Sequence, residues 1–401
     1  MNATTGLRMV VVAGVLLAWF GPVTLTAALP PDPDNAALLY YQAFLLMAQT
    51  DDRAMTDAVA NVANGAAAPN DKVREYVKQC RTAIDYAVTA SSLPRCDWGL
   101  AYSRGFSAVL PHLGQARSLA RLILAEARIL SADGDYRQAL ERCLATYRIA
   151  GHLGDNVLIS VLVSAAVSAQ ANKAVTAVLD RMPADAGTLT WLKGQLAAVP
   201  VATLTVVRSL TMEREVALDY LRPERREELI QVLGESTGIV GEAGGMSREE
   251  IRKAATDEVL GRAREYYSKF MDSVFAVLNG RMPYAEAYGK LQGLAKQAEQ
   301  DAAKDPAARL FRAGVPAVTK MYATQIRHQA DSSALQAAID VYLAKAGTGR
   351  LPASLPATAP RDPYTGSAFQ YEPTATGFVL RCRAKDLEKS EVREYRFATT
   401  R

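Results

Sequence analysis

Apolar residues recur at helical spacing along almost the whole chain, and this period constrains the fold more than any other feature of the sequence. The clearest example is residues 106–152, where leucine, isoleucine and alanine recur every three or four positions. Residues 156–182 continue the pattern, and the polar residues Asn172, Lys173 and Asp180 within them favour a buried helix over a membrane span. We therefore expect a mainly α-helical fold, either a multi-helix bundle or an irregular α-solenoid.

The helical body is expected to occupy residues 34–330, with two interruptions that are rich in small residues. A loop is predicted at residues 59–70 and a flexible, glycine-rich loop at residues 234–247. After the first loop, a single helix is predicted to begin near Asn70 and to end before Pro94. After the second loop, Ser247 and Glu250 have the spacing of a capping box, which predicts the start of another long helix.

The period changes near the C-terminus, where turn-forming and aromatic residues replace the helical pattern. The residues that carry this change are Tyr342, Asp362, Pro363, Gly366, Tyr371, Gly377 and Phe378. A turn followed by two short apolar-aromatic runs indicates a β-hairpin, and the helix before it offers an apolar stripe for packing. We expect a small C-terminal helix-plus-β-hairpin module at residues 331–401, ending in a charged tail.

The N-terminal residues have the pattern of an export signal. Arg8 precedes an uncharged stretch at residues 9–28, and small residues stand at its end. The same stretch is just long enough to span a bilayer if it is not cleaved. We therefore predict that residues 1–28 are a signal peptide or an N-terminal membrane anchor. The cation before the stretch and the acidic residues after it place the body outside the cytoplasm, in the periplasm or anchored to the inner membrane.

The composition argues against nucleic acid as a partner. The 46 Lys and Arg residues nearly balance the 42 Asp and Glu residues, which gives a net charge of +4, and the charges are interspersed along the chain. Aromatic residues make up 7% of the chain, too few for a stacking platform that would bind single strands.

No catalytic, cofactor-binding or metal-binding residue is predicted. The zinc-protease motif, the phosphate loop and the dinucleotide motif are missing, and the three histidines lie far apart in the sequence. A Gly-x-Ser-x-Gly sequence occurs at residues 234–238, but it lies in the predicted glycine-rich loop and follows no strand, as a nucleophile elbow would. Paired carboxylates are the remaining route to glycoside chemistry. The candidates are Glu213 with Glu215 and Glu249 with Glu250, for which solvated or helix-capping roles are favoured.

The most unusual local cluster is the sequence RCDWG at residues 95–99. One interpretation makes it a recognition loop formed by Arg95, Asp97 and Trp98. The favoured interpretation makes Trp98 an anchor that holds the loop on the helices. In an oxidising compartment Cys80 and Cys96 are candidates for a disulfide bond, although four cysteines allow three pairings.

The C-terminal pattern resembles the module that ends G-type pseudopilins of type II secretion. The match covers about the last sixth of the chain, at residues 334–380. It rests on the seven residues named above together with Gly347, Leu351, Pro352 and Leu355. The start of the chain departs from a prepilin, because Gly6 is not followed by an apolar helix with an early glutamate. The acidic residues near the C-terminus do not form a calcium-binding loop. The resemblance therefore implies a shared packing unit, without pilus assembly or calcium binding.

Two further resemblances concern the architecture. Small and aromatic residues near the centre of the 106–152 segment resemble one tetratricopeptide hairpin, and they are Ala127, Gly134, Tyr136, Ala139 and Leu140. No second copy occurs at the expected period, so no repeat array is implied. The overall plan also resembles a group of uncharacterised exported bacterial proteins, which implies an architecture and no activity.

The function we expect is that of an exported, non-enzymatic helical scaffold or protein-interaction protein of the bacterial cell envelope. Its partners would be envelope proteins, and the membrane if the N-terminal segment is retained. The alternatives are an exported hydrolase that acts on envelope glycans through paired carboxylates, and an accessory factor of a type II secretion-like assembly. The sequence indicates no cofactor and leaves a small-molecule ligand open.

Overall fold

The computed structural model describes residues 31–48, 52–154, 157–198, 206–235, 246–310 and 315–399. The predicted signal peptide or anchor at residues 1–28, and most of the predicted loop at residues 234–247, lie outside the described residues. From Asn35 onward the chain forms one compact unit.

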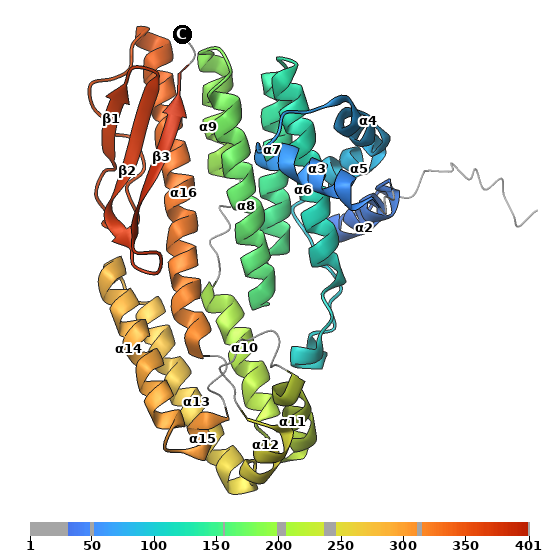
Figure 1. Cartoon of the computed structure of the whole chain (residues 1–401), viewed down its shortest axis with the longest axis vertical. Helices are drawn as coiled ribbons and strands as arrows, with labels where there is room; N and C mark the ends of the chain where they lie inside the picture. The colour runs from blue at the N-terminus through green and yellow to red at the C-terminus, as the bar shows by residue number, and fades with distance from the viewer. Residues whose placement is uncertain are drawn as a thin grey trace, which may run out of the picture. The chain divides into compact units, whose positions relative to one another are not determined.

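The fold is mainly α-helical with a small C-terminal sheet, as the periodicity predicted (Figure 1). The first described helices are α2 (Ala36–Leu46), α3 (Arg53–Asn64), α4 (Asp71–Gln79), α5 (Arg81–Ser91), η1 (Tyr102–Ser107), α6 (Pro111–Ala132), α7 (Tyr136–Leu153), α8 (Leu158–Leu179) and α9 (Ala186–Ala198). The next are α10 (Val206–Tyr220), η2 (Pro223–Arg225), α11 (Arg226–Glu235), α12 (Arg248–Ala254), α13 (Asp257–Leu278), α14 (Tyr284–Ala302), α15 (Pro306–Arg309) and α16 (Val315–Thr348).

Helices α6 and α7 form an antiparallel pair, and α8 packs against both. Gly134, in the turn between α6 and α7, has a φ of +88°, a left-handed conformation that glycine adopts without strain. The side chain of Asp135 then caps α7 by accepting a hydrogen bond from the backbone of Gln138. Among the described helices, α8 alone is long and apolar enough to cross a membrane, but more than half of its most apolar stretch is buried in the protein. It is the central helix of a packed core, as its polar interruptions predicted.

Three stretches differ from the expected secondary structure. Helix α3 occupies much of the predicted small-residue loop, because Asp52 caps its start and Gly65, with a φ of +77°, ends it. The single helix predicted after that loop is divided at Cys80 into α4 and α5. The capping box at Ser247 is present, but the helix that it begins is short, and Thr256 caps α13 as a new start.

The C-terminal sheet has three antiparallel strands in the order β1-β2-β3, one more than the predicted hairpin. The strands are β1 (Gln370–Thr374), β2 (Gly377–Asp386) and β3 (Glu391–Ala398). Strand β3 corrects the prediction of a charged tail. Its residues Arg393, Tyr395 and Phe397 are more buried than the charged residues between them, so the segment has the alternation of a half-buried strand.

The described core consists of two clusters of buried apolar residues. The larger joins α2–α9 with α16 and the sheet. The second joins α10–α15 with the first part of α8 and the start of α16. Helix α16 contributes Met321 to the second cluster and Ala323 to the first, and it runs through the predicted boundary at residue 331. The C-terminal module is therefore continuous with the helical body.

Candidate functional site

The RCDWG loop is attached to the start of α2 through its backbone. The amide of Asn35 donates to the carbonyl of Asp97 at 2.9 Å and accepts from the backbone N–H of Asp97 at 2.8 Å. The N–H of Ala36 donates to the carbonyl of Arg95 at 2.9 Å. Because Asn35 also caps α2, one side chain positions both the helix and the loop.

Trp98 lies in a cluster of aromatic rings beneath this loop, and only 5% of its surface is exposed. Its ring stacks on His112 with centroids 4.5 Å apart and on Tyr40 with centroids 5.4 Å apart, and Phe44 lies 6.3 Å away. Its indole N–H donates to the carbonyl of His152 at 2.8 Å. The protein therefore covers the ring and satisfies its donor, which leaves no face for a partner and assigns Trp98 to anchoring.

The three histidines are held in neutral form. His112 is fully buried, neither ring nitrogen has a hydrogen-bond partner among the described residues, and burial lowers its pKa to about 4. Nδ1 of His152 forms a hydrogen bond of 2.8 Å with the Tyr40 hydroxyl, and burial lowers the pKa of His152. Burial also lowers the pKa of His328 on α16. None is therefore set up to exchange protons near neutral pH.

The structure does not contain the disulfide bond that the sequence allowed between Cys80 and Cys96. Cys80 is fully buried at the junction of α4 and α5, where burial raises the pKa of its thiol. Cys96 is half-buried in the loop beside α2. Cys143 is a buried apolar residue of α7, as predicted, and burial raises its pKa to about 12.

The four candidate carboxylates have structural or solvated positions. Glu250 completes the capping box of α12, and Glu249 forms an exposed ion pair with Lys253 on the same helix. Glu215 is exposed on α10. Glu213 accepts a hydrogen bond from the backbone of Leu158, the first residue of α8, which has no capping side chain of its own. These acids do not form the facing pair that glycoside hydrolysis needs.

Replacing Glu213 with glutamine should modestly raise the melting temperature at pH 7. Burial raises the pKa of Glu213, so folding binds a proton that the unfolded chain lacks, and the charged side chain costs stability as pH rises. Glutamine keeps an acceptor for the Leu158 N–H without the buried charge. Thermal melts should show the gain at pH 7 and its disappearance at pH 4. Glu213→Ala, which loses the acceptor, should melt below wild type, and a melting point above wild type would contradict this account.

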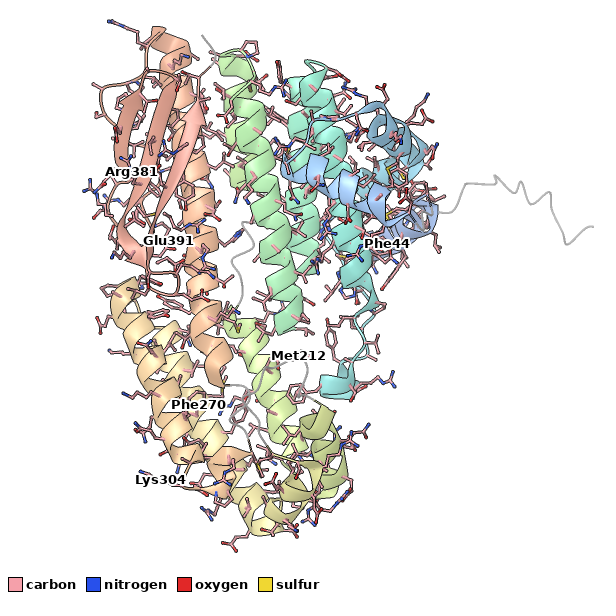
Figure 2. All side chains as sticks on the ribbon, viewed as in Figure 1. Phe44, Met212, Phe270, Lys304, Arg381 and Glu391 are labelled. Atoms are coloured by element: carbon pink, nitrogen blue, oxygen red, sulfur yellow. The ribbon has the colours of Figure 1, made fainter. Side chains whose placement is uncertain are left out.

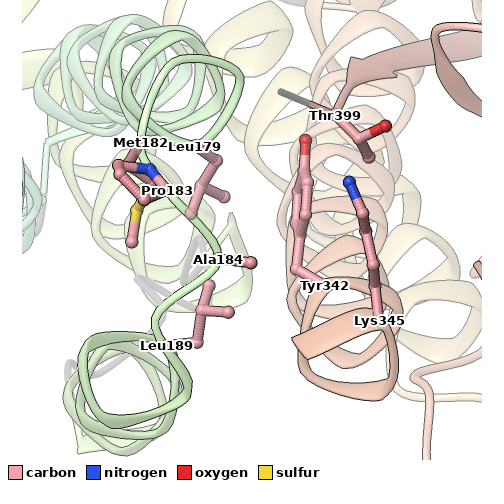
Figure 3. Close-up of a pocket in the computed structure, with 8 residues that line it drawn as sticks. All are labelled: Leu179, Met182, Pro183, Ala184, Leu189, Tyr342, Lys345 and Thr399. Atoms are coloured by element: carbon pink, nitrogen blue, oxygen red, sulfur yellow. The ribbon is translucent and has the colours of Figure 1, made fainter. Parts of the chain in front are cut away.

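A small hollow lies where the end of α8 meets α16 and the end of β3 (Figure 3). It is lined by Leu179, Met182, Pro183, Ala184, Leu189, Tyr342, Lys345 and Thr399, and its free volume of about 10 Å³ has room for one water molecule. The Tyr342 hydroxyl hydrogen-bonds both the carbonyl of Ala398 at 2.6 Å and the carboxylate of Asp180 at 3.1 Å. Asp180 also accepts from the N–H of Ala398 at 2.7 Å, so this place is a joint between helix and sheet. Within the described ranges, no group of three or more His, Cys, Asp and Glu residues could hold a metal ion.

The turn that enters the sheet is built around Asp362, which is fully buried. Its carboxylate accepts from the backbone N–H of Tyr364 at 2.9 Å and from that of Arg383 at 2.8 Å. Pro363 is half-buried, and Gly366 completes the turn with a φ of +70°. The turn motif therefore serves the fold by tying the loop to strand β2.

Aromatic rings fill the space between α16 and the sheet. The ring of Phe378 lies 5.4 Å from Tyr342, 5.8 Å from Tyr371 and 5.1 Å from Phe397, measured between centroids. A Cβ atom on Gly377 would lie 1.9 Å from the carbonyl oxygen of Phe397, so a side chain there would separate β2 from β3. The structure thus brings Tyr342, Tyr371, Gly377 and Phe378 together, while Asp362 joins the entry turn to the same sheet through the N–H of Arg383.

The end of the β2–β3 hairpin is fixed to the helices by a network that sequence reasoning missed. Arg327 on α16 donates to the fully buried carboxylate of Asp386 at 2.8 Å and to Glu388 at 2.5 Å. The Tyr284 hydroxyl on α14 accepts from the N–H of Leu387 at 3.0 Å. Figure 2 shows this end of the sheet, with Glu391 at the start of β3, close to α14. The hairpin end is consequently held in a fixed position.

Two apolar side chains remain exposed on this fixed hairpin end. Leu387 is 40% exposed and Val392 is 45% exposed. The outer face of the sheet carries alternating charges, in which Arg381 pairs with both Glu372 and Glu394. The hairpin tip, defined here as residues 387–392, therefore carries two exposed apolar side chains among polar and charged residues.

Comparison of the chain with family models, with curated proteins and with solved structures gives no match. The resemblances to a pseudopilin module and to a tetratricopeptide hairpin thus stay predictions.

Proposed function

We propose that this protein is an exported, non-enzymatic helical scaffold of the bacterial cell envelope, and that it binds another envelope protein through its C-terminal module. The observation that carries the proposal is the hairpin tip, where Leu387 and Val392 are exposed on an element fixed to the body. Apolar side chains on a rigid element bind with little loss of conformational freedom.

The rest of the module supports this role by its attachment. Asp386 fixes the hairpin to Arg327, and Asp180 fixes the other end of the sheet to the helical body. A partner bound at the tip is therefore held in a fixed position relative to α16, which packs in both core clusters. That arrangement suits a scaffold, which must hold a partner in a set orientation.

The location outside the cytoplasm rests on the sequence of residues 1–28, with Arg8 before the apolar stretch. The partner is therefore another exported protein. Its chemistry is expected to match the tip, with an apolar recess for Leu387 and Val392 and charges complementary to those of the adjacent sheet face.

Site-specific photo-crosslinking on the full-length protein in its own envelope tests the proposal. A photoreactive amino acid is placed at Leu387, and a matched control is placed at Val109, which is 68% exposed. We expect one exported protein to crosslink from position 387 and not from position 109. Once that protein is known, its co-purification with the unlabelled chain is measured, and the double variant Leu387→Ser, Val392→Ser should reduce its recovery at least tenfold, which corresponds to about 1.4 kcal/mol of binding free energy.

Equal crosslinking from both positions, or undiminished recovery with the double variant, would overturn the role of the tip. Turnover of envelope glycans that a single carboxylate substitution abolishes would overturn the non-enzymatic proposal. Deleting the whole module is not a suitable test, because α16 belongs to the core and its loss would unfold the body.

A further inference from the structure

Helix α2 is apolar on all sides but has only one side covered by protein. Its sequence, AALLYYQAFLL, contains no charged residue. The covered side consists of Ala36, Ala37, Tyr40, Ala43 and Phe44, which pack against the rest of the core. A helix that is apolar on all sides is normally buried on all sides, so the uncovered side requires an explanation.

The uncovered side carries three leucines at helical spacing. Leu38 is 49% exposed, Leu45 is 82% exposed and Leu46 is 43% exposed. Gln42, exposed between them, is polar but uncharged. Residues 38, 42, 45 and 46 lie on one side of a helix, so the leucines form an apolar stripe that only Gln42 interrupts. A single exposed leucine is ordinary on a protein surface, whereas such a stripe marks a surface that is covered in the cell.

The chain that precedes α2 indicates what covers the stripe. The uncharged stretch at residues 9–28 is long enough to span a bilayer, and seven residues, 29–35, join it to α2. Seven residues reach at most about 25 Å, and three of these seven are prolines, which stiffen the connection. Helix α2 is therefore confined to the membrane surface if the stretch remains in the bilayer.

We propose that residues 9–28 are retained as a membrane anchor, and that α2 lies on the outer leaflet of the same bilayer with Leu38, Leu45 and Leu46 inserted at the boundary between headgroups and acyl chains. This inference rests on the proposed export of the protein and decides between the two forms that the sequence left open. The anchor keeps α2 close to the bilayer. The leucine stripe is the apolar face that an interfacial helix inserts about 5–10 Å deep.

A lipid surface suits the stripe better than a second copy of the chain. An eleven-residue helix is about 16 Å long and 10 Å across. One side of it therefore offers an area far smaller than the roughly 800 Å² that each partner buries in a stable dimer. A lipid surface needs no matching shape, and the absence of charge from α2 removes the cost of bringing ions to the interface.

Thiol labelling of the full-length protein in intact spheroplasts tests the inference. One variant carries Leu45→Cys, and the matched control carries Lys253→Cys, whose native side chain is 76% exposed on α12. The unsubstituted chain gives the background from its native cysteines. With a membrane-impermeant maleimide, we expect position 253 to react at least tenfold faster than position 45, because a thiol among lipids ionises poorly. After solubilisation in detergent, the two positions should react at similar rates when the maleimide is small enough to enter a micelle.

The outcomes separate this inference from the proposed function. Labelling of position 45 as fast as position 253 in spheroplasts overturns the membrane contact and leaves export intact. Labelling of neither position until the membrane is broken places the body in the cytoplasm and overturns the proposed function itself. Protection of position 45 that persists in detergent shows that protein covers the stripe, and this also overturns the inference.

Discussion

Replacing Arg327 with methionine should lower the free energy of unfolding by about 3–5 kcal/mol. Asp386 is fully buried, and Arg327 is its cationic partner. Burial alone raises the pKa of Asp386, but the hydrogen bond and charge of Arg327 overcome this effect and hold the pKa below its ordinary value. Methionine fills much of the same volume but leaves the carboxylate without a cation. Chemical denaturation followed by circular dichroism at pH 7 measures the loss.

The pH dependence of the stability loss in Arg327→Met shows whether the buried charge of Asp386 is its cause. In the native protein the depressed pKa of Asp386 contributes stability that is lost as pH falls below about 4. In Arg327→Met the pKa should rise instead, so that the difference between variant and wild type shrinks as pH falls from 7 to 4. The double variant Arg327→Met, Asp386→Asn should recover part of the loss at pH 7. A deficit that is the same at both pH values and in the double variant would show that lost packing, rather than the charge, is responsible.

The helical part of the fold could be predicted because its signals are local. The α6–α7 pair follows from apolar residues three and four positions apart and from a turn that contains Gly134. The capping box of Ser247 and Glu250 involves residues of one helical turn, and it is present as predicted. The seven C-terminal residues also carry local turn and strand signals. Such features depend on neighbours within a few positions.

The errors arose where a weak local signal depends on distant packing. The second half of helix α3 is rich in alanine, asparagine and valine, a composition that predicts a loop, although α6 covers the apolar side of the helix. The composition of strand β3 predicts a charged tail, because its alternation is visible only once Tyr395 contacts Asp331 and Phe397 contacts Tyr342 on α16. The bracing contacts join residues far apart in the chain, such as Arg327 with Asp386, and no pattern in the sequence pairs them.

At the candidate site, the RCDWG loop also combines a local signal that the sequence reveals with distant contacts that it does not. Its composition identified it as unusual, but its role depends on residues more than fifty positions away. Asn35 holds its backbone and the carbonyl of His152 accepts from Trp98. The sequence could therefore locate the cluster without showing whether Trp98 faces a partner or the core.

Lowering the pH from 7 to 4 should reduce the free energy of unfolding by about 3 kcal/mol through His112 alone. Burial lowers the pKa of His112 from 6.5 to about 4, and no charged group contributes to this shift. Between these two values the unfolded chain binds a proton that the folded protein excludes, so stability falls as pH decreases. A shift of one pKa unit corresponds to about 1.36 kcal/mol. The lowered pKa values of His152 and His328 act in the same direction.

The variant His112→Phe separates this effect from general acid sensitivity. Phenylalanine keeps a ring stacked on Trp98, and no hydrogen bond is lost, because neither nitrogen of His112 has a partner among the described residues. We expect the variant to be at least as stable as wild type at pH 7, since an unsatisfied buried polar group is removed. Denaturation curves at pH 7, 6, 5 and 4 should show a much shallower loss. An unchanged slope would mean that His112 is hydrated or charged in the folded protein, and the Trp98 cluster would then be open to water rather than a sealed anchor.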